Sequence, residues 1–141
     1  MADRVLVPLD GSEKAEEALE YAIEEFPEAE ITVLHALDLT AGGPAKGTVI
    51  LDDDAVRENI EGKAQSIFET AQEIASKAGY DGELETVQSK RTPADAILEQ
   101  AEDFDTIVMG THGRVGVGQK LLGSVAETVV RRSPVSVVVV K

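Results

Sequence analysis

The sequence predicts an α/β domain in which helices cover both faces of a five-stranded parallel sheet. Short apolar runs alternate along the chain with longer segments whose apolar residues recur at helical spacing, in the order β-α-β-α-β-α-β-α-β. Several of the short runs are apolar at consecutive positions, which is typical of parallel strands buried on both faces. With 141 residues and no low-complexity linker, we expect one domain spanning residues 1–141.

Each expected strand and helix follows from its own pattern of apolar residues. In the first helix, for example, Ala15, Ala18 and Leu19 occupy positions i, i+3 and i+4 of one helical face. The expected strands are residues 4–9, 31–36, 84–89, 104–109 and 135–140. The expected helices are residues 12–26, 56–78, 92–101 and 125–130.

Capping residues and prolines mark the expected helix ends. Ser12 is the expected N-cap of the first helix, which ends before Pro27 because proline has no N–H to donate within a helix. Gly79 is expected just beyond the second helix, where glycine tolerates a positive φ. The stretch from Thr92 to Asp95 predicts a helix start, with the cap at Thr92, proline next and an acid at the third position.

The other segments lack helical periodicity. From residue 37 to 54 no period is present, which predicts an exposed flexible loop. Asp52 to Asp54 is interpreted as a solvated acidic run rather than a metal site, because adjacent residues rarely converge on one ion. Half of residues 84–89 are polar, so this strand is expected near a sheet edge. The valines of residues 135–140 occupy both faces of their strand, and each face therefore needs cover.

A glycine-rich passage from Gly110 to Val125 joins the fourth strand to the last helix. Two glycines, Gly110 and Gly113, stand at the strand exit, and the pair Gly123-Ser124 stands at the helix start. Glycine lets backbone lie against a ligand, and a helix start offers unpaired N–H groups to an anion such as phosphate. The alternative is a mobile surface loop, since no Walker or dinucleotide fingerprint is present.

The spacing Gly110-x2-Gly113-x9-Gly123-Ser124 resembles the nucleotide-binding signature of the universal stress protein family, in its ATP-binding branch. The stretch from Val5 to Ser12 resembles the family's first strand and acidic turn, and Ser133-Pro134-Val135 with the following valines resembles its last strand. The resemblance runs nearly from end to end. It implies a Rossmann-like fold with strand order 3-2-1-4-5, which opens a crevice between strands one and four.

The resemblance also implies a ligand set and an assembly. ATP is the expected nucleotide, together with Mg²⁺ or Mn²⁺, and a homodimer is expected through the last strand, Val135–Val140. Asp10 would accept from adenine or ribose, whereas by its position alone it is a turn or capping residue. The implied nucleotide-binding residues are Pro8, Leu9, Asp10, Ala36, Met109, Gly110, His112, Gly113, Arg114, Gly123, Ser124 and Val125.

His35 and Ser124 are residue types that can act in catalysis, but the sequence favours other roles for both. His35 lies inside an expected strand and is interpreted as a structural histidine. Ser124 has no G-x-S-x-G elbow around it and is explained by a helix start as a cap or phosphate donor. We therefore predict an ATP-binding stress-response module with little or no turnover and no catalytic residue. A dimeric interaction protein without nucleotide and a slow ATPase are the alternatives.

Composition restricts the class of partners. The net charge of −14 argues against a broad nucleic-acid surface and makes a phosphate site depend on local donors. There are no cysteines, so disulfides and cysteine chemistry are excluded. Neither a signal peptide nor an apolar run of membrane length is present, and a cytoplasmic location is expected. The acidic surface also predicts a halophilic-type protein suited to high ionic strength.

Overall fold

The computed structural model describes residues 3–36, 54–111 and 123–141, with residues 54–60 described by their backbone alone. The predicted alternation of strands and helices is confirmed. The strands are β1 (Arg4–Pro8), β2 (Glu30–Ala36), β3 (Glu85–Ser89), β4 (Thr106–Gly110) and β5 (Ser136–Val140). The helices are α1 (Glu13–Glu25), α2 (Asp54–Lys77), α3 (Pro93–Ala101) and α4 (Ser124–Arg132). The expected loop of residues 37–53 lies outside the described residues.

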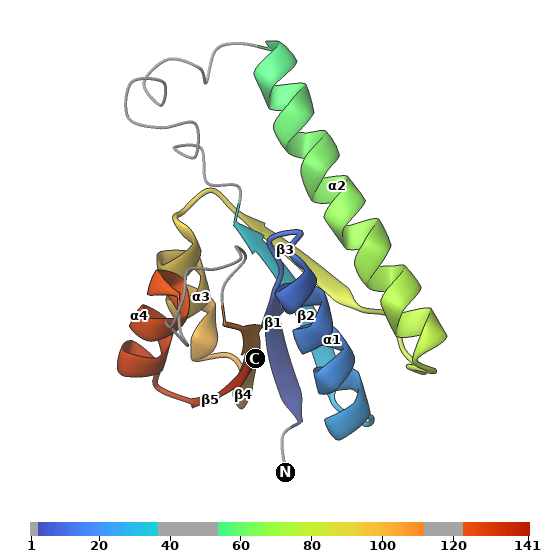
Figure 1. The fold of residues 1–141 in the computed structure, drawn as a ribbon, viewed down its shortest axis with the longest axis vertical. Helices are drawn as coiled ribbons and strands as arrows, with labels where there is room; N and C mark the ends of the chain where they lie inside the picture. Colours follow the sequence, from blue (N-terminus) through green and yellow to red (C-terminus); the bar gives the residue numbers. More distant parts are fainter. Residues whose placement is uncertain (1–2, 37–53, 112–122) are drawn as a thin grey trace.

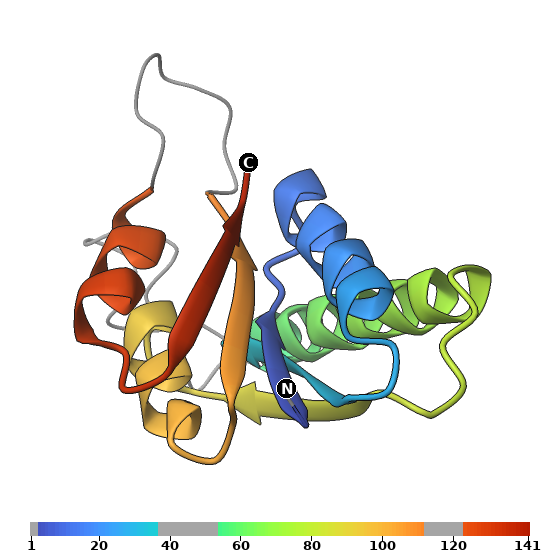
Figure 2. The same ribbon diagram turned by 90° about the horizontal axis from the view of Figure 1, so that it is seen from below.

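The five strands form one parallel sheet in the order β3-β2-β1-β4-β5, which confirms the predicted topology. Helices α1 and α2 cover one face of the sheet and α3 and α4 cover the other (Figures 1 and 2). The polar strand β3 lies at one edge, as expected from its sequence, and the valine-rich β5 lies at the other. None of the helices described here has the length and apolar character needed to cross a membrane.

Each central strand supplies side chains to two separate apolar clusters. In β1, Val5 and Val7 pack with α1 and α2, while Leu6 packs with α3 and α4. In β4, Val108 joins the first cluster, and Ile107 joins the second. Because successive strand residues point to opposite faces, an unbroken apolar run is what a sheet covered on both sides requires.

The ends of α1 and α2 have the geometry that their sequences predict. The Ser12 side chain accepts a hydrogen bond from the Ala15 amide at 3.2 Å and caps α1. After α2, Gly79 has φ of +80°, and its N–H donates to the Ser76 carbonyl at 3.2 Å. The Tyr80 N–H donates to the Ala75 carbonyl at 3.0 Å, which completes a Schellman motif.

The later helices differ in detail from their sequence expectations. Thr92 is the N-cap of α3, but its hydroxyl donates to the Asp95 carboxylate at 3.1 Å instead of accepting from a backbone amide. Helix α4 is longer than expected, and Gly123, not Ser124, is its N-cap. Exposed polar and basic residues extend this helix beyond its apolar positions, so periodicity alone underestimated its length.

The amino-terminal edge of the sheet is fastened by Asp105, which precedes β4. Its carboxylate accepts hydrogen bonds from the amides of Arg4, at 2.9 Å, and Asp3, at 3.0 Å. The guanidinium of Arg4 lies 4.8 Å from the centre of the Phe104 ring and donates to the Asp103 carbonyl at 2.7 Å. The Arg4 and Asp3 amides hold the pKa of Asp105 below its ordinary value because they stabilise the ionised carboxylate.

We expect Asp105→Asn to lower the melting temperature at neutral pH, because the amide lacks the charge that strengthens these two bonds. A depressed pKa in the folded state stabilises the protein above the unfolded-state pKa, near pH 4, and this stabilisation is lost as the pH falls through the folded-state pKa. The melting-temperature difference between wild type and variant should therefore shrink on acidification. Thermal unfolding at a series of pH values from 7 downward measures this difference in melting temperature, and Asp103→Asn is the control. A difference independent of pH contradicts the role of the charge.

Candidate functional site

Strands β1 and β4 separate toward their carboxyl ends. Their register contains two residue pairs, whereas β1 with β2, β2 with β3, and β4 with β5 each have five. The main chain of Arg4 faces β4, because its carbonyl accepts from the Asp105 amide at 2.9 Å. Main-chain groups alternate sides along a strand, so Leu6 and Pro8 face β4 as well. Pro8 has no N–H, and the ladder cannot continue past it.

This separation opens a crevice at the carboxyl edge of the sheet. It lies at the point where the chain order reverses, with β2 and β3 on one side of β1 and β4 and β5 on the other. Ligands of open parallel sheets bind at such switch points. The turn after β1, the end of β2 and the exit of β4 border the crevice, and these segments contain many of the residues predicted from the sequence.

The turn after β1 is rigidly held. The Leu9 N–H donates to the Leu34 carbonyl at 2.8 Å, and the Leu9 carbonyl accepts from Nδ1 of His35 at 2.9 Å. Oδ1 of the exposed Asp10 accepts from the Ser12 amide at 2.9 Å, which is the turn role that its position alone suggests. The described residues provide no hydrogen-bond partner for its second oxygen, Oδ2.

Ala36 ends β2 with its main chain directed toward the crevice. The Leu34 carbonyl faces β1, because it accepts from the Leu9 amide, and Ala36 faces the same way two residues later. The next bond of the ladder would join the Ala36 N–H to the Leu9 carbonyl. That carbonyl is bonded to His35 instead, and no bond joins it to Ala36. The Ala36 N–H and C=O therefore extend past the end of the β1 ladder.

The exit of β4 is packed tightly against α1. A Cβ atom on Gly110 would lie 2.7 Å from the Lys14 carbonyl oxygen and 2.8 Å from its carbonyl carbon. Real Cβ atoms do not approach backbone so closely, so glycine is required here by helix–strand packing. The sequence suggested that Gly110 borders a ligand, but the close approach that fixes its identity is to Lys14.

Two backbone bonds join the exit of β4 to β5 and to the start of α4. The Thr111 N–H donates to the Val140 carbonyl at 3.1 Å, and the Thr111 carbonyl accepts from the Gly123 N–H at 2.9 Å. These bonds place the predicted residue Gly123 beside the exit of β4, with Ser124 and Val125 following it in the first turn of α4. The predicted residues His112, Gly113 and Arg114 lie between the two joined ends, outside the described residues.

Helix α4 begins with amides that find no acceptor in the described part of the chain. Gly123 has an extended backbone with ψ of 174°, and in the described residues no side chain caps the helix. Its own N–H is bonded to Thr111, whereas the described residues provide no acceptor for the amides of Ser124, Val125 and Ala126. These three N–H groups, the exposed Ser124 hydroxyl and the helix dipole form an anion-binding arrangement.

Cationic side chains stand at the same edge in a strongly acidic protein. Lys14 packs against Gly110, Lys90 and Arg91 follow β3, and Lys141 follows β5. The sequence analysis did not include them in the site, because their placement depends on parallel strands ending at one edge. Since adjacent strands end at a shared edge, listing the charges that follow each predicted strand would have found Lys90, Arg91 and Lys141.

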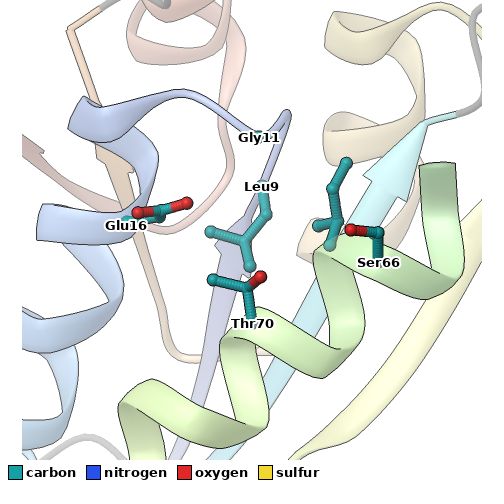
Figure 3. A pocket seen from close by; sticks show the side chains of 6 residues that line it. Leu9, Gly11, Glu16, Ser66 and Thr70 are labelled. Atoms are coloured by element: carbon teal, nitrogen blue, oxygen red, sulfur yellow. The ribbon is translucent and has the colours of Figure 1, made fainter.

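A small pocket lies behind the turn after β1, between α1 and α2 (Figure 3). Glu16 of α1 lies on one side of it and Ser66 and Thr70 of α2 on the other, with Leu9 between them. Its volume is about 110 Å³. Sites for drug-sized ligands have roughly 300–1,000 Å³, so this pocket is too small for a nucleoside. It is the seam where the turn packs against α2.

The described residues contain no cluster of three or more His, Asp or Glu side chains able to hold a metal ion. The predicted acidic run from Asp52 to Asp54 is not among the side chains described.

These features define a class of protein, a doubly wound α/β domain with a ligand crevice where its strand order reverses and an open helix start beside it. The sequence profile of the universal stress protein family matches residues 1–141, and the chain belongs to that family. The family resemblance of the sequence and the predicted fold are thus confirmed.

Relatives of known sequence match along the whole chain. Universal stress protein MJ0531 of Methanocaldococcus jannaschii is 34% identical over 145 residues, which cover 98% of this chain and 81% of that protein. Universal stress protein YxiE of Bacillus subtilis is 29% identical over 100% of both chains.

Solved structures share the fold, and some contain adenine nucleotides. A universal stress protein from Archaeoglobus fulgidus in complex with dAMP superposes with a TM-score of 0.67 at 26% identity, covering 98% of this chain and 97% of that one. A universal stress protein in complex with cAMP gives a TM-score of 0.73 at 25% identity, covering 99% and 97%.

Gly110→Ala should destabilise the protein by about 1–3 kcal/mol, because the new methyl group must displace the backbone of Lys14. Urea unfolding measures the change. Gly62→Ala in α2 is a matched control, since a Cβ there meets nothing within 4 Å. Replacing this helical glycine should raise the protein's free energy of unfolding by about 0.5–1 kcal/mol. Equal effects of the two substitutions would contradict the packing explanation.

Proposed function

We propose that this protein binds ATP in the crevice between β1 and β4 and acts as a nucleotide-responsive stress-response module with little or no turnover. The observation that carries the proposal is the bond between Gly123 and Thr111, which joins the start of α4 to the exit of β4. The dAMP and cAMP complexes of related universal stress proteins support adenine nucleotides as the ligand class.

The base would bind at the end of β2. Adenine presents a hydrogen-bond acceptor, N1, beside a donor, the N6 amine, and the Ala36 N–H and C=O offer the complementary pair. Asp10 would accept from the ribose or the base through its second oxygen. Pro8, Leu9 and Met109 would provide apolar surface and border the base and sugar, as the family resemblance implies.

The phosphates would bind at the start of α4. The free amides from Ser124 onward and the Ser124 hydroxyl would donate to phosphate oxygens, and an amide donor keeps its strength without adding positive charge. His112, Gly113 and Arg114 are assigned to the same end by sequence alone. Because the net charge is −14, added salt or Mg²⁺ should strengthen binding by screening the repulsion.

Mg²⁺ or Mn²⁺ would fit this arrangement as a companion of the phosphates. Phosphate oxygens and water would hold it, since the described residues offer no metal-binding cluster. When bound, the ion would neutralise phosphate charge. We assign no catalytic residue, and the cytoplasmic location expected from the sequence stays a prediction.

A homodimer through β5 is part of the proposal. The edge strand β5 leaves Val137 to Val140 half-buried, and α4, which packs beside it, exposes 44% of Val130. A long apolar edge is a pairing site for a second copy unless it is covered. A two-fold partner adding its own β5 would cover this edge.

Ser124→Ala should weaken ATP binding by about 1–3 kcal/mol, because a hydroxyl donor to a charged phosphate is lost. Calorimetric titration with ATP, ADP and AMP, with and without Mg²⁺, measures the loss, and adenosine should bind both proteins equally. Ser76→Ala, at the far end of α2, is the matched control. The proposed function is refuted if the wild-type protein binds none of the three nucleotides at millimolar concentration. Release of phosphate from ATP over hours would instead favour a slow ATPase.

Val139→Pro should convert the dimer to a folded monomer. Val140 accepts from Thr111 and so faces β4, which directs the main chain of Val139 to the open edge. Proline there removes an outward N–H without breaking the ladder to β4. Sedimentation velocity measures the change, with Val139→Thr, which keeps its N–H, as control. A wild type that sediments as a monomer at micromolar concentration excludes the dimer.

A further inference from the structure

His35 is a buried histidine on β2 that makes one polar contact with the described part of the chain. Its side chain is 7% exposed, and its Nδ1 lies 2.9 Å from the Leu9 carbonyl oxygen. Because a carbonyl can only accept, the contact requires a proton on Nδ1. The ring meets Phe68 of α2 edge-on, with centroids 6.4 Å apart. His35 therefore lies on the α1/α2 side of the sheet.

The bond from His35 replaces the next bond of the β1–β2 ladder. The register pairs Pro8 with Leu34, so Leu9 lies opposite His35, and in a parallel ladder Leu9 bonds the residues on either side of its partner, Leu34 and Ala36. A regular ladder would continue with the Ala36 N–H donating to the Leu9 carbonyl. The imidazole of His35, a residue of β2 itself, donates to the Leu9 carbonyl in place of the Ala36 amide. The Ala36 N–H is therefore not part of the β1–β2 ladder.

We propose that His35 is a positioning residue for base recognition, which holds the Leu9 carbonyl away from Ala36 and so keeps the main-chain edge of Ala36 open to the ligand. This inference rests on the proposed nucleotide site. His35 does not touch the ligand itself, since it packs with Phe68 whereas Ala36 packs with the apolar cluster of the opposite face. It acts through the Leu9 backbone, and the same bond fixes the turn that carries Asp10.

The consequence is a preference for adenine. An open N–H beside a C=O matches N1 and N6 of adenine, while hypoxanthine presents N1–H and O6, the reversed pair. A buried or crevice-lining polar group that meets the wrong partner is left unpaired, which makes such sites selective. If the Leu9 carbonyl captured the Ala36 N–H, the edge would close and the preference would be lost.

The test compares ATP with inosine triphosphate in variants of the full chain. Wild type should prefer ATP, and His35→Leu should reduce that preference by about tenfold, because the donor that diverts the Leu9 carbonyl is gone. Affinity for inorganic tripolyphosphate should not change. His35→Asn, whose amide nitrogen can approximate the Nδ1 position, should restore most of the preference. Thr32→Val, a buried substitution of similar size on the same strand, is the control and should behave as wild type.

Measurements on the wild type keep the inference testable even where a variant fails to fold. Nitrogen-15 spectra should show His35 protonated on Nδ1, and the Ala36 amide should gain protection from hydrogen exchange when ATP binds. A His35 ring protonated on Nε2 alone, an Ala36 amide unaffected by ATP, or an unchanged preference in His35→Leu overturns the inference. A wild type without affinity for any nucleotide overturns the proposed function instead.

Discussion

The hydrogen-bond ladders that β1 forms with β2 and with β4 stop at different residues, and the candidate site depends on this difference. Toward β2 the ladder continues to the Leu9 amide, whereas toward β4 it stops after Leu6, because Pro8 has no N–H. From β1 the chain continues to β2 on one side, and from β4 it continues to β5 on the other side. Because the crossovers are right-handed, the two helix pairs then cover opposite faces of the sheet. The crevice is the result of both constraints.

The amino edge of the same strands is closed. There, the Asp105 carboxylate bonds two successive amides, and the Arg4 guanidinium covers the Phe104 ring. At the carboxyl edge, main-chain groups at the end of β2 and the start of α4 have no partner among the residues that the structure describes. Backbone groups at one edge are satisfied by the protein itself, and those at the other are left for a ligand.

Any phosphate site in a protein with a net charge of −14 must overcome the repulsive overall field through local groups. Amides at a helix start have fixed direction and partial positive charge, and they lose little on binding because they are already ordered. Lys90 and Lys141, which follow β3 and β5, stand at the same edge and counter part of the long-range repulsion, whereas Arg91 is paired with Glu99 at 3.2 Å. This division explains how a net charge of −14 is compatible with a phosphate site.

The sequence by itself determined the kinds of elements, their order and several of their ends, because these depend on local rules. Apolar period, the Ser12 cap and the glycine after α2 act within one or two turns of chain. The strand order and the candidate residues around Asp10 and Gly123 came from resemblance to a family. Only the tertiary structure decided which of the described main-chain groups lack a hydrogen-bond partner within the described chain. Glycine at position 110 is required by the backbone of Lys14, and the freedom of Ala36 depends on a bond between His35 and Leu9. Those contacts join segments distant in sequence, and no local pattern specifies which side of a strand its main-chain groups will face.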